Sequence, residues 1–404
     1  MRCRGGLGTL ALGSAMLMAF GLSGCGGSSP KPGESSSPLE FAARVQIDRD
    51  GAPVDVVDDL QPANPAGDGN SVCPPVSIAM AGALNGPDAG LGVDVQNGIQ
   101  LAVDQHNAAN PACQVQLKPF DTEGDPDRIR DLAAQIVDDA YTVGVVGPVS
   151  SAETQAAGEV FDRAGLIAAT PSATDPALAQ NGWRTFFRGV AGDGVQGPAV
   201  ARYMSETLGY RNVCVVDDSS DYGLGLATSV RETLGAVADS ACNIAVRSDA
   251  TDFSGIVTQI NAAAPDSVFF AGYSPVAATL VRQLREGGFG GAFVGADGAK
   301  NESFVEQAES AASGALLSCP CSPATPEFVD EYSSVFAQQP GPYSVEAYDL
   351  ATILLKGIDS GALTRPALLE YVANYDGQGI ARRYRWDRAG ELENPLIWIY
   401  DVVE

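Results

Sequence analysis

The chain has 404 residues, of which 50 are Asp or Glu, 24 are Lys or Arg and one is His, so its formal net charge is −26. So acidic a surface repels the phosphates of nucleic acids and the head groups of anionic lipids, which excludes both as expected partners. The acidic residues are scattered rather than clustered, which is typical of a surface that keeps a protein soluble.

The first 24 residues have the features of a bacterial lipoprotein signal peptide. Two arginines lie within the first four residues, and the apolar run that follows, Leu7–Phe20, is too short to span a bilayer as a mature helix. The run ends in Leu22-Ser23-Gly24-Cys25, which resembles a lipobox. We therefore expect cleavage before Cys25 and a lipid anchor on its thiol, at the extracytoplasmic face of the cell membrane. An ordinary secretory signal with a chance cysteine is the alternative.

Removing residues 1–24 takes away two arginines and no acids, so the mature chain has 22 basic and 50 acidic residues, a formal charge of −28. No later segment has the pattern of a membrane span, so we expect membrane contact through the lipid anchor only. Residues 25–73 are predicted to be the anchor, a tether rich in Gly, Ser and Pro, and an extension in which 41–60 could form a strand pair. The rest of the chain, roughly 330 residues, exceeds the usual size of one core, which predicts two lobes.

From residue 75 onward, short apolar runs alternate with amphipathic segments. The first series predicts strands at 76–84, 113–120, 142–148 and 166–170, and helices at 93–107, from 125 and from 151. Asp125 and Pro126 favour a helix start, with the Asp as its cap and the Pro at its first position.

The same alternation recurs after residue 190. This second series predicts strands at 212–218, 243–247, 267–272 and 292–296, and helices that begin near Tyr222, Asp252 and Pro275. Strands separated by helices indicate parallel sheets with helices on both faces, so the predicted fold class is α/β with two doubly wound parallel-sheet lobes. In such sheets ligands bind at the carboxyl ends of the strands.

Six cysteines follow the lipobox, and an even number in an exported chain indicates disulfides. Two of them precede apolar strands that should be sheet neighbours in the first series, and two more have the same arrangement in the second. The predicted pairs are Cys73 with Cys113, Cys214 with Cys242, and Cys319 with Cys321. A metal site at the last pair is disfavoured, because zinc sites use wider cysteine spacing or histidine partners. We expect no metal and no cofactor.

The sequence contains few of the residues and motifs that enzymes commonly use for catalysis. The single histidine, His106, lies late in a predicted helix, where we expect it to face solvent rather than to act as a base. Neither a G-x-S-x-G elbow nor a Walker-type G-x-x-x-x-G-K occurs, and residues 121–127 fail the spacing of a calcium loop. We therefore expect no enzyme, although nothing excludes one that uses a pair of carboxylates.

The loops at the strand ends resemble those of type I periplasmic binding proteins, most of all the branched-chain amino-acid (Leu/Ile/Val) receptors of ABC importers. In chain order they are GALNGPDAGLG, GPVSSAETQAA, ATPSATDPAL, FRGVAGDGVQGP, DDSSDYGLG, FFAGY and VGADG. The likeness covers residues 74–404, and the order of all seven makes it specific. It implies two lobes joined by a three-strand hinge. The implied lobes are 74–191 plus 320–379, and 192–319 plus 380–404.

The resemblance also implies a ligand site between the lobes. The implied ligand-binding residues are Leu91, Ser151, Ser172, Thr174, Tyr222, Tyr273 and Asp297. Ser151 would bind an α-carboxylate together with the free N–H groups of a helix start. Ser172 would offer a carbonyl and Thr174 a hydroxyl near the α-amino and α-carboxyl groups. The tyrosines would form a wall, and Asp297 would face the ammonium group.

Each of these residues also has a purely structural interpretation. Ser151 could be a helix cap, the 172–174 segment a turn that its own side chains stabilise, and the tyrosines packing residues. Asp297 could be a solvated loop acid. The chain also departs from the family pattern, which often has an aromatic residue in place of Leu91 and Glu in place of Asp297.

The resemblance implies the solute-binding component of an ABC importer. It would be a monomer that binds an aliphatic, branched-chain L-amino acid between its lobes and presents it to a membrane permease. Two alternatives remain open: a ligand-sensing receptor of the same fold, and a binder of another amino acid or a small amide.

Overall fold

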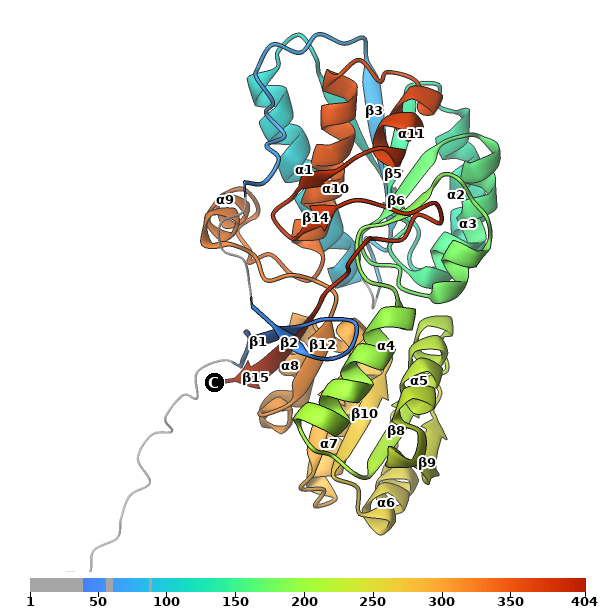
Figure 1. Cartoon of the computed structure of the whole chain (residues 1–404), viewed down its shortest axis with the longest axis vertical. Coiled ribbons are helices and arrows are strands. Elements are labelled where there is room, and N and C mark those ends of the chain that lie inside the picture. The colour runs from blue at the N-terminus through green and yellow to red at the C-terminus, as the bar shows by residue number, and fades with distance from the viewer. Residues whose placement is uncertain (1–38, 56–60, 87–88) are drawn as a thin grey trace, which may run out of the picture. The chain divides into compact units, whose positions relative to one another are not determined.

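The computed structural model describes residues 39–55, 61–86 and 89–404. These residues belong to one compact unit that is built on two main sheets, each with helices against it (Figure 1). The predicted signal peptide and Cys25 lie outside the described residues. Within the described part of the chain, no helix has both the length and the apolar character needed to cross a bilayer.

The first sheet has five parallel strands in the order β4-β3-β5-β6-β7. Its strands are β3 (Val76–Gly82), β4 (Val115–Asp121), β5 (Thr142–Val146), β6 (Ile167–Thr170) and β7 (Phe186–Arg188). The connecting helices are α1 (Ala89–Ala109), α2 (Pro126–Asp138) and α3 (Ser151–Arg163). Every residue of β3, β5 and β6 is buried, as expected when helices cover both faces of a parallel sheet. Asp125 caps α2 by accepting a hydrogen bond from the Asp127 N–H at 2.8 Å.

The second sheet has eight strands in the order β2-β1-β15-β12-β11-β10-β8-β9. Its parallel strands are β8 (Val213–Asp217), β9 (Ala238–Ala245), β10 (Ser267–Ala271), β11 (Ala292–Gly295) and β12 (Leu316–Cys319). Its helices are α4 (Asp193–Arg202), α5 (Asp221–Leu234), α6 (Ser254–Ala263), α7 (Ser274–Glu286) and α8 (Glu302–Ala308). The two series of strands and helices confirm the predicted α/β fold.

Three antiparallel strands extend the second sheet at the β12 edge. They are β15 (Ile397–Val403), β1 (Glu40–Ile47) and β2 (Pro53–Val54). Residues 40–54 therefore form the strand pair that the sequence allowed, and they are part of the second sheet rather than of a separate extension. Pairing of Glu40–Ile47 with the last strand of the chain satisfies the backbone groups of both, which a local sequence pattern does not reveal.

The C-terminal helices return to the first sheet. They are α9 (Pro326–Phe336), α10 (Ser344–Asp359) and α11 (Arg365–Ala373), and α10 packs along α1 (Figure 1). A two-stranded ribbon of β13 (Gly377–Gln378) and β14 (Arg383–Tyr384) follows. These helices and the ribbon contribute buried side chains to the core of the first sheet.

The last crossing between the sheets lies later than the expected position near residue 380. Tyr384, Trp386 and Leu392 are buried in the core of the first sheet, and the Trp386 indole N–H donates to the Arg188 carbonyl at 2.6 Å. The chain enters the second sheet only at Ile397. The segment after residue 380 stays with the first sheet because its large apolar side chains are buried there.

All three predicted disulfides are present in the structure. The Cα atoms lie 4.6 Å apart in Cys73–Cys113, 5.1 Å apart in Cys214–Cys242 and 5.0 Å apart in Cys319–Cys321. The first joins the segments just before β3 and β4, and the second joins β8 to the middle of β9, so each links two neighbouring parallel strands as the sequence pattern indicated. The third closes a tight loop where the chain leaves β12.

The prediction that His106 faces solvent is wrong. Its side chain is fully buried beneath α10, and its Nε2 atom lies 2.9 Å from Oδ1 of Asp359. Asp359 and Cys113 complete a group of potential metal ligands among the described residues, but the Cys113 sulfur is bonded to Cys73 and offers no thiolate. The histidine therefore joins two helices, which explains its burial.

Candidate functional site

The sheet topology places four of the predicted site residues at two crevices. The strand order reverses between β3 and β5 in the first sheet and between β8 and β10 in the second. Leu91 and Ser151 follow the first pair of strands, and Tyr222 and Tyr273 follow the second pair. Crevices outside the carboxyl ends of strands at such reversals are where ligands bind in open α/β sheets.

All seven predicted site residues line one small cavity. A larger cavity of about 620 Å³ adjoins it and shares Leu91, Tyr222 and Asp297 with it. We call these two cavities the cleft. Its walls combine loops that follow strands of both sheets, so residues as far apart in sequence as Leu91 and Asp297 meet there. Ligand contact by these residues stays a prediction.

On the first-sheet side, the start of α3 leaves the Ser151 hydroxyl available. The cap of this helix is the preceding residue, Ser150, whose hydroxyl accepts from the Glu153 N–H at 3.3 Å while the Glu153 carboxylate accepts from the Ser150 N–H at 3.0 Å. Ser151 is therefore not the cap. Its hydroxyl oxygen accepts a bond from the Asp175 N–H at 3.2 Å and keeps its own proton for another acceptor.

The loop after β6 carries the other two hydroxyls. The Ser172 hydroxyl donates to the Val149 carbonyl at 2.7 Å, whereas the buried Thr174 hydroxyl has no hydrogen-bond partner among the described residues. Arg188, which is fully buried, holds this loop by donating to the carbonyls of Ala173 at 2.7 Å and Asp175 at 3.0 Å. The loop geometry therefore depends on a side chain outside the loop.

On the second-sheet side, Asp297 is the centre of a hydrogen-bond network. Its Oδ1 accepts from Gln196 Nε2 at 2.8 Å and from the Tyr222 hydroxyl at 2.7 Å, and its Oδ2 accepts from the Tyr343 hydroxyl at 2.7 Å. The rings of Tyr222 and Tyr273 lie beside each other with centroids 5.3 Å apart. Asp297 is only 6% exposed, so it is a buried acid and not a solvated loop residue.

A second buried acid lies behind the site. Burial raises the pKa of Asp193 well above its usual range and the charge of Asp297 raises it further, whereas Thr174 and Arg188 lower it. Neither carboxylate oxygen of Asp193 has a partner in full hydrogen-bond geometry among the described residues, so the Thr174 hydroxyl favours its charged form through a weaker contact. Burial likewise raises the pKa of Asp297, against the three hydrogen bonds that favour its charged form. This part of the cleft would therefore be stabilised by an added cation.

Sequence reasoning missed three residues of this network. Asp193 and Gln196 lie within FRGVAGDGVQGP, which carried the family resemblance, but nothing in the motif marked them as site residues. Tyr343 lies just before α10 in a left-handed backbone conformation with φ of 65°, and no motif contained it. An unusual conformation at a helix start is visible only in the structure.

Comparison with known proteins identifies the family. The model of the periplasmic binding protein family matches residues 75–399, which is most of the chain. The chain belongs to the periplasmic binding protein family. Membership confirms the prediction of an extracytoplasmic solute-binding protein rather than an enzyme.

Individual relatives of this periplasmic binding protein are named for amino-acid binding. The leucine-, isoleucine-, valine-, threonine- and alanine-binding protein of Pseudomonas aeruginosa is 28% identical over 337 residues, which cover 81% of this chain and 89% of the relative. The Leu/Ile/Val-binding protein of Escherichia coli K12 is 27% identical, with 81% of this chain and 90% of the relative covered.

Solved structures agree with this relationship. The branched-chain amino acid transporter substrate binding protein LivJ of Streptococcus pneumoniae, in complex with isoleucine, superposes with a TM-score of 0.75 at 27% identity, covering 82% of this chain and 99% of that chain. The leucine binding protein LivK of Thermotoga maritima gives a TM-score of 0.72 at 25% identity, covering 81% and 98%.

Proposed function

We propose that this periplasmic binding protein binds an aliphatic L-α-amino acid in the cleft and presents it to the permease of an ABC importer. The observation that carries the proposal is the complementary set of polar groups around one cavity. Hydroxyls and helix-start amides lie on the first-sheet side, and a buried acid lies on the second-sheet side. A zwitterion has both of the charges that such a set needs.

The α-carboxylate would lie against Ser151 and Thr174. The Ser151 hydroxyl has its proton free, and the Thr174 hydroxyl is unpartnered among the described residues. The first backbone N–H groups of α3 lie at Ser151, where the helix begins, and helix starts favour anions. A buried hydroxyl without a partner is costly, so a ligand that supplies an acceptor would be stabilising.

The α-ammonium group would lie against Asp297. Three hydrogen bonds fix the orientation of this carboxylate and still leave acceptor capacity on Oδ2, which takes only the Tyr343 bond. Asp193 adds a second buried negative charge or a protonated acid nearby. The positive charge of an ammonium group would offset the free-energy cost of burying the Asp297 carboxylate, because a buried charge is costly unless it is paired.

The side chain of the ligand would contact Leu91, Tyr222 and Tyr273. These residues give an apolar wall, and the relatives named above bind leucine, isoleucine and valine. Because the ligand would touch loops of both sheets, binding would favour a closed arrangement, which the permease could recognise. We expect the binding protein to act as a monomer that Cys25 anchors to the membrane.

Calorimetry with purified mature protein tests the ligand. The panel contains L-leucine, L-isoleucine, L-valine and L-alanine, with D-leucine, isobutylacetamide and glucose as controls. We expect the branched-chain L-amino acids to bind most tightly. Tightest binding of a molecule without an α-amino group would contradict the proposal. Mass spectrometry of the mature N-terminus tests the anchor, and an unmodified N-terminus at another residue would contradict it.

A further inference from the structure

The part of the chain ahead of the family match contacts both halves of the molecule, the one built on the first sheet and the one built on the second. The match to the periplasmic binding protein family begins at residue 75, whereas the described structure begins at residue 39. Two described segments, residues 40–55 and 61–73, precede the match, and together we call them the N-terminal strap. Figure 1 shows the first segment beside β15 and the second segment running along the half that contains α1.

The first segment of the strap is fixed to the second sheet. β1 pairs with β15 from Glu40 to Ile47, and the Ile47 side chain is fully buried. The turn that follows packs on α4, where the Arg202 guanidinium donates to the Arg49 carbonyl at 2.9 Å. The backbone of Gly51, with φ of 76°, comes so close to this helix that a Cβ atom would lie 2.5 Å from a carbonyl oxygen of α4. This segment must therefore move together with the second sheet.

The second segment of the strap is fixed to the half that is built on the first sheet. The Ala63 N–H donates to a carbonyl of β13 at 2.7 Å. Asn110, which is buried at the end of α1, donates from its side chain to the Ala66 carbonyl at 3.0 Å. The disulfide between Cys73 and Cys113 then joins the end of the strap to this half covalently. This segment must therefore move together with the first sheet.

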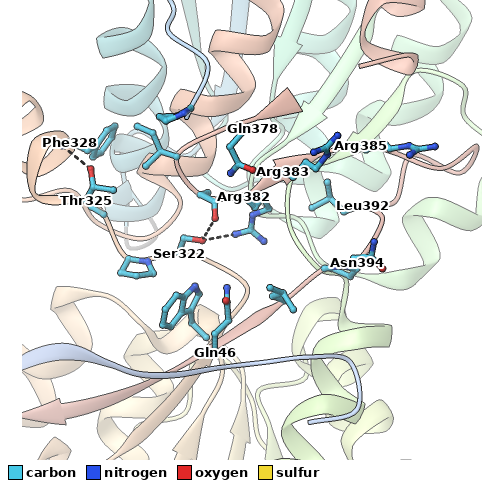
Figure 2. A pocket seen from close by; sticks show the side chains of 18 of the residues that line it. Gln46, Ser322, Thr325, Phe328, Gln378, Arg382, Arg383, Arg385, Leu392 and Asn394 are labelled. Carbon is cyan, nitrogen blue, oxygen red and sulfur yellow. Dashed lines mark hydrogen bonds between the residues drawn. The ribbon is translucent and has the colours of Figure 1, made fainter. Parts of the chain in front are cut away.

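The chain crosses from one half to the other between these two segments. Asp55, at the end of the first segment, and Pro62, near the start of the second, line the same cavity of about 940 Å³. Figure 2 shows Gln46 of β1 and Gln378 of β13 on opposite sides of this cavity. Residues 56–60 join Asp55 to Gln61 in the sequence, and a chain of this length spans at most about 21 Å. The crossing therefore has a maximum length in every arrangement of the two halves.

We propose that the N-terminal strap is an additional connection between the halves, outside the family match, that limits the range of arrangements which the ligand-free protein adopts. The lining of the cleft comes from both halves, so the shape of the cleft depends on how they are placed. A ligand that touches both halves fixes their arrangement in the complex, with or without the strap. Without the strap, the free protein would lose more arrangements on binding, which lowers the affinity. The effect on affinity rests on the proposed function, whereas the limit on the free protein does not.

An insertion lengthens the strap without replacing any residue that holds it. A flexible insertion is placed between Gln61 and Pro62, which are both exposed. It contains the recognition sequence of a site-specific protease, so that the strap can also be cut after the protein has folded. The matched control has the same insertion between Gly290 and Gly291, in the loop that joins α7 to β11 within the second half. Melting temperatures of the uncut proteins show that each variant is folded.

Distances across the cleft test the limit on the ligand-free protein. Pulsed electron paramagnetic resonance measures them between spin labels at two exposed residues, Asp127 of α2 and Ser248 after β9. Non-natural amino acids carry the labels, so the disulfides stay intact. We expect a wider range of distances in the protein with the lengthened strap and at least as wide a range after cutting, whereas the control keeps the wild-type range. Equal ranges in the wild-type, lengthened and cut proteins would overturn the proposal.

Calorimetry with leucine gives the second readout. We expect Kd to rise about threefold when the strap is lengthened or cut, and to stay unchanged in the control. An unchanged Kd in the cut protein would overturn the effect on affinity. If leucine does not bind the wild-type protein, the proposed function fails, and the distances alone decide whether the strap limits the free protein. Native mass spectrometry should show the cut N-terminal fragment still bound through β1, and its release would refute a fixed end on the second sheet.

Discussion

The Tyr343 hydroxyl donates to the Asp297 carboxylate at 2.7 Å across 46 residues of sequence. Tyr343 belongs to the core of the first sheet, whereas Asp297 follows β11 of the second. The bond therefore joins the two halves of the cleft at the acid that we propose for the ligand ammonium. Both residues are buried, so water does not compete strongly for either partner.

Removing this hydroxyl should weaken amino-acid binding. Tyr343→Phe keeps the ring and deletes one of the three donors that orient Asp297, so we expect the affinity for leucine to fall by about 1 kcal/mol, roughly fivefold. Tyr348→Phe in α10 is the matched control, because it deletes a hydroxyl that bonds to Gln105 outside the cleft. Calorimetry checks both. Equal effects of the two variants would contradict a specific role for Tyr343.

Replacing Asp297 should have a larger effect. Asp297→Asn keeps the shape of the side chain but removes the charge that would pair with the ammonium group. We expect a loss of at least about 2 kcal/mol in the binding free energy of leucine, roughly 30-fold in Kd. Asp221→Asn removes an exposed charge at the edge of the larger cavity and should change the affinity by less than about twofold. Unchanged affinity in Asp297→Asn would mean that the ammonium group lies elsewhere.

The affinity should depend on pH in a direction set by the buried acids. Burial raises the pKa of Asp297 in the free protein above its ordinary value of about 4, and that of Asp193 is raised as well. A bound ammonium group favours the charged carboxylate of Asp297 and lowers its pKa. Binding therefore releases a proton at any pH between the pKa of Asp297 in the complex and its pKa in the free protein. The affinity should therefore fall as the pH falls through the free-protein pKa and should level off above it.

Calorimetry between about pH 4.5 and 8, in buffers with different heats of ionisation, measures this proton release. The groups that face Asp297 are Asp193, Gln196, Tyr222 and Tyr343, of which the tyrosines have raised pKa values through burial and stay neutral in this range. An affinity that does not vary with pH would contradict the pairing of the ammonium group with an acid.

Arg188 should support both stability and binding. Arg188→Met removes the fully buried guanidinium that pairs with Glu391 at 2.7 Å and holds two carbonyls of the loop that carries Thr174. Glu391 is 30% exposed and stays partly solvated, but the two loop carbonyls lose their donor, so we expect a loss of about 1–3 kcal/mol of unfolding free energy. Leucine affinity should fall as the loop loosens. Arg184→Met, at an exposed arginine nearby, should change neither quantity. Denaturant unfolding and calorimetry give the two readouts, and full stability of Arg188→Met would refute the role.

By itself, the sequence determined the elements and the places where ligands could bind. Apolar periodicity predicts strands such as Val213–Asp217, and the Asp125-Pro126 pair predicts a helix start, because both depend on side chains close together in the chain. Strand-end positions predicted where ligands could bind in each sheet, and the family resemblance implied that Ser151 and Asp297, which follow strands of different sheets, belong to one site.

Only the tertiary structure decided which side chains meet across long separations. Tyr343 reaches Asp297, α10 buries His106, and residues 384–392 stay with the first sheet until Ile397 enters the second. None of these contacts leaves a local pattern, because each depends on the packing of segments that lie tens or hundreds of residues apart. The free energy of burying large apolar and hydrogen-bonded side chains, which involves the whole fold, decides such contacts.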